Sequence, residues 1–251
     1  MDGNARLSAL VQVLQQDGHL DVADMAAQLG TAEMTIRRDL DRMVTMGLAR
    51  RVRGGAISLL MRGQELPYSM RVLDRADAKT RIAAAVADVL GDGEAVVLDS
   101  GTTAVLIARA LAGRRLTVMP MSLHAASELA GRDSIRLLMP GGDTRPGELS
   151  MIGPLALASL RALRFDTAVL SCCGFADGRI TAHDLGDAEV KLAMAQAAAR
   201  VVLATDSSKF RQTAMAVVGA ATEADMVITD TDAPAEAVES LRSAGLEVRC
   251  V

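Results

Sequence analysis

The sequence predicts an α/β protein of two domains: a small domain of short helices, followed by a larger domain with a mostly parallel sheet. Two observations support this prediction. Within residues 6–57, apolar residues recur at helical spacing in three short segments, and an alternating basic segment follows them. Within residues 77–251, apolar strand-like runs alternate with helical runs, which is typical of a parallel sheet covered by helices on both faces.

The composition indicates a folded chain with a filled core. Of its 251 residues, 50% are apolar and 23% are charged. The net charge is −4, so any nucleic-acid site has to be local, and the few aromatic residues argue against stacking on single-stranded nucleic acid. Cys172, Cys173 and Cys250 lack zinc-site spacing, and we see no secretion leader or membrane segment. We therefore expect a reduced, cytoplasmic protein with no metal, cofactor or membrane partner.

Three helices and a hairpin are expected in residues 1–57. The first helix follows Leu7, Leu10, Val11 and Leu14, which share one helical face. A second helix covers about 21–29 and a third about 32–46; Asp21 is the expected N-cap of the second. Residues 47–57, "GLARRVRGGAI", alternate and turn like a hairpin. This order predicts a winged helix-turn-helix.

The third helix has an apolar face and a basic face. The expected inward face consists of Ile36, Leu40, Met43 and Gly47. Between Glu33 and Arg53 there are six arginines against three acids, which suits a helix in the major groove and a wing on phosphates. The alternative is a solvated surface helix. The predicted DNA contacts are Met34, Thr35, Arg37, Arg38, Arg42, Arg50, Arg51 and Arg53.

Residues 58–76 lose this periodicity and are interpreted as a linker, and residues 77–251 as the second domain. Helices are expected near 79–93, 102–113 and 123–131, and strands near 94–101, 116–122, 135–142, 166–174, 199–208, 224–230 and 246–251. Ligands of such sheets bind beyond the carboxyl ends of the strands.

Polar residues and glycines follow several of these strands. Asp99, Ser100, Gly101, Thr102 and Thr103 open a helix and could form an anion cradle, although a simply capped helix start is the alternative. Other strand ends supply Ser122, Gly141, Gly142, Arg145, Gly174, Asp206 and Lys209. Residues 181–191 hold His183, Asp184, Asp187, Glu189 and Lys191. We favour a polar loop that lines the pocket, with Asp184 and Lys191 in the site, over a metal centre.

Residues 21–56 closely resemble the N-terminal module of the DeoR family of bacterial transcriptional regulators. The family signature Thr-Ile-Arg-Arg-Asp-Leu is matched by residues 35–40, Gly-Leu by 47–48, and Gly-Gly-Ala by 54–56. Two positions depart from it. Thr31-Ala32 replaces Val-Ser, so Thr31 becomes the expected cap of the third helix, and Arg53 replaces the His of the wing.

The rest of the chain resembles the sensor domain of the same family. The matching residues are Asp99, Gly101, Thr102, Thr103, Gly141, Gly142, Gly174, Lys191 and Asp206 to Lys209. The resemblance implies a Rossmann-like fold shared with ribose-phosphate isomerases and coenzyme A transferases, and a phosphorylated sugar as effector. In place of the family's Thr-Asn, this chain has Pro120-Met121.

The sequence is therefore interpreted as a DNA-binding repressor of carbohydrate-metabolism genes, controlled by a phosphorylated sugar or related metabolite. Its partners would be double-stranded operator DNA and a second copy of the chain, in a dimer or tetramer. One alternative is a sugar-phosphate isomerase-like enzyme with Asp184 or Glu189 as base and Lys191 stabilising an enediolate. Another is a structural module whose helices bind protein.

Overall fold

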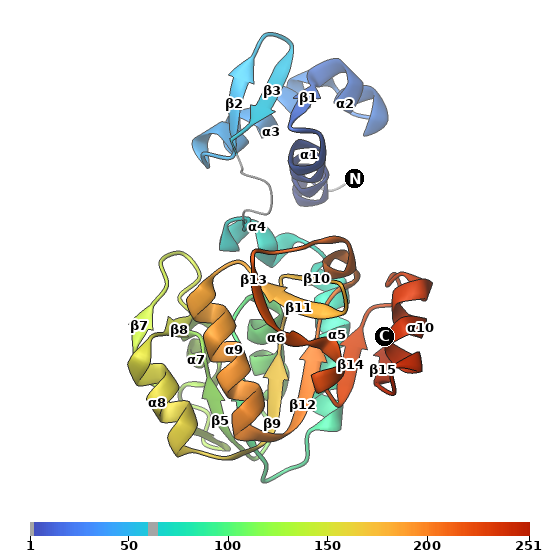
Figure 1. The fold of residues 1–251 in the computed structure, drawn as a ribbon. Helices are drawn as coiled ribbons and strands as arrows, with labels where there is room; N and C mark the ends of the chain where they lie inside the picture. Colours follow the sequence, from blue (N-terminus) through green and yellow to red (C-terminus); the bar gives the residue numbers. More distant parts are fainter. Residues whose placement is uncertain (1–2, 60–64) are drawn as a thin grey trace. The chain divides into compact units, whose positions relative to one another are not determined.

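The computed structural model of the protein describes residues 3–59 and 65–251. The chain divides into two compact units, Met1–Asp74 and Arg75–Val251, drawn in Figure 1. Each unit has its own hydrophobic core.

The N-terminal unit consists of three main helices and a small antiparallel sheet, which confirms the winged helix-turn-helix. The helices are α1 (Gly3–Asp17), α2 (Val22–Gln28) and α3 (Glu33–Thr45). The sheet has the order β1 (His19–Asp21), β3 (Gly55–Ser58), β2 (Ala49–Val52), and β2 and β3 form the wing. Leu10, Leu14, Ile36, Leu40 and Met43 are fully buried between these elements.

The ends of the helices agree only partly with the sequence-based expectation. Asp21 caps α2 as predicted, because its carboxylate accepts hydrogen bonds from the N–H groups of Ala23 and Asp24. The cap predicted for α3 is wrong: the N-cap residue is Ala32, and no side chain caps it. Gly47 is exposed in the turn after α3, where its φ is +71°, so it does not belong to the inward face.

A short helix lies within the segment interpreted as a linker. Helix α4 (Tyr68–Leu73) follows Pro67, and Met70 is buried in the core of the N-terminal unit. At six residues it is too short to show helical periodicity in the sequence. Residues 60–64 of the predicted linker lie outside the described residues.

The C-terminal unit is built on a seven-stranded sheet in which every neighbouring pair is parallel. In order across the sheet, the strands are β15 (Glu247–Cys250), β14 (Met226–Thr229), β12 (Ala198–Ala204), β9 (Phe165–Leu170), β4 (Ala95–Leu98), β5 (Leu116–Pro120) and β6 (Ile135–Leu137). The runs of Val, Leu, Ile and Ala in the five inner strands are mostly buried, as expected for a covered parallel sheet, whereas the edge strand β15 is largely exposed.

Helices cover both faces of this sheet. Figure 1 shows α8 (Pro154–Ala162) and α9 (Leu185–Ala197) on one face, and α5 (Ala76–Val89), α6 (Thr102–Leu111) and α7 (Leu123–Leu129) on the other. Helix α10 (Ala235–Ser243) packs beside β15 at one edge. The predicted α/β class is therefore confirmed. None of the helices in the described ranges has the length and apolar character needed to cross a membrane.

Two small antiparallel sheets, separate from the main sheet, were not predicted. A hairpin joins β7 (Asp143–Thr144) and β8 (Met151–Ile152). A small sheet joins β10 (Gly174–Ala176), β11 (Arg179–Ala182) and β13 (Ala216–Ala220), and is followed by the 3-10 turn η2 (Ala221–Glu223); η1 (Ser207–Arg211) precedes β13. Both small sheets follow carboxyl ends of the parallel strands, so they contribute side chains at the edge where ligands of such sheets bind.

Candidate functional site

Helix α3 presents one apolar and one basic face. Ile36, Leu40 and Met43 are completely buried, whereas Arg38 is exposed. Within the described part of the chain, Arg38 has no hydrogen-bond or ion-pair partner. Met34 is 60% exposed on the same helix, so an apolar contact with a thymine methyl group is sterically open to it.

The other predicted DNA-contacting arginines fall into two groups. Three are held by acids of the same unit: Arg37 by Glu33 at 3.1 Å, Arg42 by Asp39 at 3.9 Å, and Arg51 by Asp41 at 3.6 Å. Arg50 and Arg53 are exposed on the wing. Like that of Arg38, their side chains have no hydrogen-bond or ion-pair partner among residues 3–59 and 65–251. Arg53 lies in the turn between β2 and β3, next to Gly54 with a φ of +82°.

Asp39 was not predicted to be a structural residue. It is 4% exposed, and its carboxylate accepts a hydrogen bond from Nε of Arg6 on α1 at 2.6 Å. The helical spacing of apolar residues could not reveal the structural role of Asp39, because the partner that makes its burial possible is distant in the sequence. Asp39 thus orients α3, whereas its neighbour Arg38 points to solvent.

In the C-terminal unit, the predicted effector residues centre on Asp99 and Lys191. Asp99 follows β4, and its carboxylate accepts hydrogen bonds from the backbone N–H of Ser100 at 2.7 Å and of Ser171 at 2.7 Å. The ammonium group of Lys191, on α9, contacts the same carboxylate and is buried with it. Burial would lower the pKa of Lys191, but the negative charges around it, of which Asp99 is the foremost, together outweigh burial, so the pKa is raised and Lys191 stays charged.

A second ion pair lies close to the first. Asp187, also on α9, accepts a hydrogen bond from Oγ of Ser150 at 2.7 Å and pairs with Nε of Arg145 at 2.8 Å. Burial raises the pKa of Asp187, although the positive charge of Lys191 opposes the shift. Since both ion pairs act on each other electrostatically, the β7–β8 segment, α9 and the end of β4 form one polar region.

Loop 206–209 contributes two further charged side chains, Asp206 and Lys209. Asp206 is 2% exposed, and its carboxylate accepts a hydrogen bond from the N–H of Ser208 at 3.0 Å. Burial would raise the pKa of Asp206, but the positive charges of Lys209 and Lys79 lower it below its ordinary value. Lys209 is half-buried, and its Nζ reaches the side-chain oxygen of Gln212 at 3.4 Å.

Several predicted effector residues have a structural role that is visible in the fold. Ser122 is fully buried and caps α7, where it accepts a hydrogen bond from His124. A Cβ on Gly142 would lie 2.5 Å from the carbonyl oxygen of Ile152, and one on Gly174 would lie 2.2 Å from that of Gln212. Close backbone packing is therefore sufficient to explain why both of these positions are glycine.

Met121 belongs to the hydrophobic core, so it does not line the polar region.

Most of the remaining predicted residues lie at helix starts. Gly101 is the N-cap of α6, with a φ of +95° and no side-chain cap, and Thr102 and Thr103 are buried in the first turn. Gly141 approaches Leu155, and Asp184 caps α9 by accepting a hydrogen bond from the N–H of Asp187. Glu189, the other base of the enzyme alternative, is exposed on α9.

The sequence reasoning missed two residues of the polar region. Ser171 directly follows β9 and hydrogen-bonds Asp99 through Oγ at 2.9 Å, so the rule of strand ends could have found it. Glu148 is 5% exposed and approaches Gly101, but it lies in an irregular loop where no sequence signal marks it.

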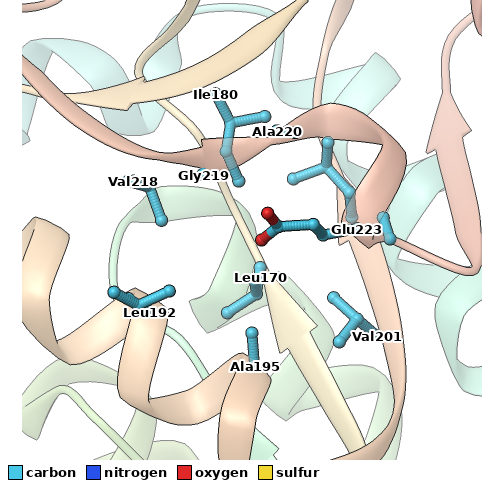
Figure 2. Close-up of a pocket in the computed structure, with 11 residues that line it drawn as sticks. Leu170, Ile180, Leu192, Ala195, Val201, Val218, Gly219, Ala220 and Glu223 are labelled. Atoms are coloured by element: carbon cyan, nitrogen blue, oxygen red, sulfur yellow. The ribbon is translucent and has the colours of Figure 1, made fainter.

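An apolar pocket lies apart from these polar groups. Figure 2 shows it between α9 and β13, with the carboxylate of Glu223 among the side chains of Leu170, Val201 and Ile180. A water-sized sphere can occupy about 20 Å³ of it, which is room for about one water molecule. No predicted effector residue lines this pocket.

A winged helix-turn-helix joined to an α/β unit with a buried polar site defines a two-domain transcriptional regulator. Residues 6–60 match the family described as the DeoR-like helix-turn-helix domain, and residues 74–231 match the DeoR C terminal sensor domain. The chain belongs to the DeoR family of transcriptional repressors, as the resemblance predicted.

Proteins whose sequences are similar to this chain include relatives named as repressors. The glycerol-3-phosphate regulon repressor of Escherichia coli is 28% identical over 96% of this chain and 96% of its own. The transcriptional repressor AccR of Agrobacterium fabrum is 30% identical over 90% of this chain and 89% of its own. A ribose 5-phosphate isomerase A structure from Methanocaldococcus jannaschii has a TM-score of 0.39 and 20% identity, over 54% of this chain and 55% of that one.

Proposed function

We propose that the protein represses carbohydrate-metabolism genes and that a phosphorylated sugar or related metabolite changes its affinity for operator DNA. The observation that supports this most is the gathering of polar groups at the start of α6. Asp99, Ser171 and Lys191 come from three different elements there, and Arg145 and Asp187 lie beside them. A relative named for glycerol 3-phosphate, a small phosphorylated polyol, fits the same class of effector.

The phosphate would be held mainly by neutral donors. Lys191 and Arg145 already neutralise Asp99 and Asp187, so they bring no surplus positive charge. The first N–H groups of a helix have no partner within it, and α6 lacks a side-chain cap, which leaves these donors for an anion. The hydroxyl groups of Thr102 and Thr103 and the half-buried Lys209 complete the proposed set.

At the DNA, Arg38 would read base edges in the major groove while Arg50 and Arg53 contact phosphates. Operators of helix-turn-helix proteins are two-fold, so we infer a homo-oligomer, a dimer or tetramer, in the cytoplasm. Effector control requires different effector affinities in the DNA-bound and released arrangements.

A thermal-shift screen of the full-length protein against sugar phosphates, each beside its unphosphorylated sugar, tests the effector class. A ligand that binds only the native state raises Tm with concentration, and the hit should release the protein from operator DNA in a mobility-shift assay. Thr102→Val and Lys209→Ala should abolish this response and leave DNA binding intact. Induction that survives both changes would overturn the proposed phosphate position.

The enzyme alternative has less support than the regulator. The relatives are named repressors, and of the two candidate bases Asp184 caps a helix while Glu189 faces solvent. Incubation of the full-length protein with pentose and hexose phosphates tests it: stoichiometric binding without turnover is expected, and catalytic interconversion of ketose and aldose phosphates would reverse the assignment.

A further inference from the structure

We propose that Arg75 is the positioning residue that couples the effector site to operator binding. Its guanidinium group holds loop 206–209 at the start of α5, and effector binding at this loop acts through Arg75 on α4, the last helix of the N-terminal unit. This inference rests on the proposed function, because it concerns how the same effector changes operator affinity. It gives a role to a residue that the sequence placed in a linker.

The position of Arg75 in the chain is the first step. Arg75 is the first residue of the C-terminal unit and the N-cap residue of α5, and Asp74 is the last residue of the N-terminal unit. Met70, on α4, is buried in the core of the N-terminal unit, so only residues 71–74 separate that core from Arg75. Because this connection is short and begins as a helix, a change in the backbone of Arg75 is passed to α4 along the chain.

The side chain of Arg75 is bound to the loop that carries Lys209. Nη1 of Arg75 donates a hydrogen bond to Oγ of Ser207 at 2.7 Å. The same hydroxyl group donates to Oδ2 of Asp230 at 2.8 Å, and the backbone N–H of Ser207 donates to Oδ1 of Asp230 at 2.6 Å. The guanidinium group also lies 3.9 Å from Asp206 and 3.8 Å from Asp230, and both carboxylates are buried. Arg75 therefore ties the residues that follow β12 and β14 to the start of α5.

The backbone of Arg75 has an unfavourable conformation. Its φ of +51° and ψ of +37° lie in the left-handed region, which residues other than glycine rarely adopt. Such a conformation persists where surrounding contacts impose it, and here the hydrogen bond to Ser207 and the ion pairs fix the side chain. Weaker contacts would let Arg75 return to an ordinary conformation and change the direction of the chain between α4 and α5. The junction thus has two available arrangements, which transmission of an effector signal requires.

The effector would act on this contact through Lys209. Burial would raise the pKa of Asp206, but the positive charge of Lys209 helps to lower it, so these two side chains interact electrostatically. A phosphate bound by Lys209 would compete with Asp206 for that charge and would repel Asp206, which Arg75 also contacts. Lys209 and Ser207 lie in the same 3-10 turn, so a shift of Lys209 toward the phosphate also moves the hydroxyl group that Arg75 holds.

The test compares the full-length wild type with Arg75→Met and with Arg81→Met. Arg81 is the matched control, because it is an exposed arginine of the same helix α5. The probes are inorganic phosphate, glycerol 3-phosphate and a set of pentose and hexose phosphates. Titration calorimetry measures probe binding, and fluorescence anisotropy measures the affinity for operator DNA with and without the probe.

We expect a probe that binds to change the operator affinity of the wild type and of Arg81→Met about tenfold, a typical size for coupling between two sites. Arg75→Met should still bind the probe and the operator, but the probe should change its operator affinity by less than about twofold. Loss of the response with both binding activities retained distinguishes a coupling role from a role in either site.

Four results would overturn the inference. A full response in Arg75→Met would remove the coupling role and leave the proposed effector class standing. Loss of probe binding by Arg75→Met would make Arg75 part of the effector site itself. An equal loss of response in Arg81→Met would assign the effect to overall charge. Absence of binding of every probe to the wild type would remove this inference and the proposed effector class together.

Hydrogen exchange gives a second readout that needs no ligand and uses a milder substitution. Ser207→Ala removes the hydroxyl group that Arg75 holds but retains the guanidinium group and its ion pairs. Ser159→Ala is the control, because it also removes one hydroxyl group, which donates a hydrogen bond to the carbonyl of Pro140 instead.

Two backbone hydrogen bonds flank the proposed junction. The N–H of Asp74 donates to the carbonyl of Met70 at 3.2 Å, and the N–H of Lys79 donates to the carbonyl of Arg75 at 3.0 Å. We expect Ser207→Ala to make exchange faster at both N–H groups and Ser159→Ala to leave it unchanged. Unchanged exchange at Asp74 in Ser207→Ala would mean that the loop does not act on α4, and would overturn the inference whatever the effector is.

Discussion

Nε of Arg6 donates a hydrogen bond to Oδ2 of Asp39 at 2.6 Å, and this bond ties the first helix of the protein to its recognition helix. Asp39 is buried. Of its two neighbours in the sequence, Leu40 packs in the core and Arg38 is exposed to solvent. The ion pair therefore fixes the rotation of α3 about its own axis.

Asp39→Ala should lower the free energy of unfolding of the N-terminal unit by about 3 kcal/mol, because it leaves the guanidinium of Arg6 without its buried partner. Denaturant unfolding followed by circular dichroism measures this. Asp41→Ala, on the exposed side of the same helix, removes only a surface ion pair with Arg51 and should cost less than about 1 kcal/mol. Similar losses in both variants would mean that the pair with Arg6 has no special weight.

Arg38→Ala and Arg53→Ala should weaken operator binding in different ways. Arg38 is proposed to contact bases, so its loss should also reduce the preference for operator over random DNA, by about 1–3 kcal/mol. Loss of Arg53, a phosphate contact, should weaken binding to both DNAs alike and reduce the salt dependence by about one counterion. Fluorescence anisotropy titrations at several salt concentrations distinguish these outcomes. Unchanged preference in Arg38→Ala would contradict its role in base reading.

Lys191→Met should destabilise the C-terminal unit by about 4 kcal/mol, because Asp99 is then buried without its positive partner. Lys209→Met is the matched control, since Lys209 is half-buried and its Nζ donates a long hydrogen bond of 3.4 Å to the side chain of Gln212. The control should lose effector response but little stability. A Lys191→Met protein that is as stable as the wild type would show that the ion pair is dispensable for folding.

Asp206 and Asp187 should affect stability with opposite pH dependence. The pKa of Asp206 is lowered from 3.8, so its contribution is present above that pH and is lost as the pH falls through the folded-state value. The difference in free energy of unfolding between wild type and Asp206→Asn should therefore shrink as the pH is lowered from about 6 to about 3, a range that includes the ordinary pKa of Asp.

The pKa of Asp187 is raised from 3.8, so its contribution to stability has the opposite pH dependence to that of Asp206. Its favourable contribution is present at low pH and is lost as the pH rises, and wild type should gain relative to Asp187→Asn on acidification. Tm measured across this range for both variants is the check. Parallel profiles for the two variants would contradict the assigned shifts.

The cysteines should differ sharply in reactivity. Burial raises the pKa of the Cys172 thiol to about 12, so almost no thiolate is present at neutral pH, whereas Cys250 is exposed. Iodoacetamide at pH 8 should therefore modify Cys250 first and leave Cys172 intact until the protein is unfolded. Mass spectrometry of the peptides gives the order, and early labelling of Cys172 would show that the strand end opens readily.

The periodic parts of the fold could be predicted from the sequence. The helices on Leu7 to Leu14 and on Ile36 to Met43 and the seven parallel strands all follow from the spacing of apolar residues. Helix α4, the β7–β8 hairpin and β1 are too short to show a period. The small sheet of β10, β11 and β13 depends on pairing between distant segments, which local spacing cannot reveal.

The site could be predicted by position but not by role. The strand-end rule selected Asp99 and Asp206, which lie among charged groups, but it also selected Gly174, which a close backbone approach explains equally well. That Arg6 pairs with Asp39, that Arg51 pairs with Asp41, and that Glu148 approaches Gly101 depends on contacts between different elements of the fold. Such contacts leave no trace in local residue order.

The pairing of Arg37, Arg42 and Arg51 with acids of their own unit has a consequence for how the protein searches a genome. Each of these arginines has a carboxylate beside it, so bringing the arginine to a phosphate also brings a negative charge, and fewer of the cations condensed on the DNA are displaced than by an unpaired arginine. Together with a chain charge of −4, this keeps the attraction to random DNA weak. Residence on chromosomal sites would then be decided by fit to the operator rather than by charge, and few copies would be trapped elsewhere.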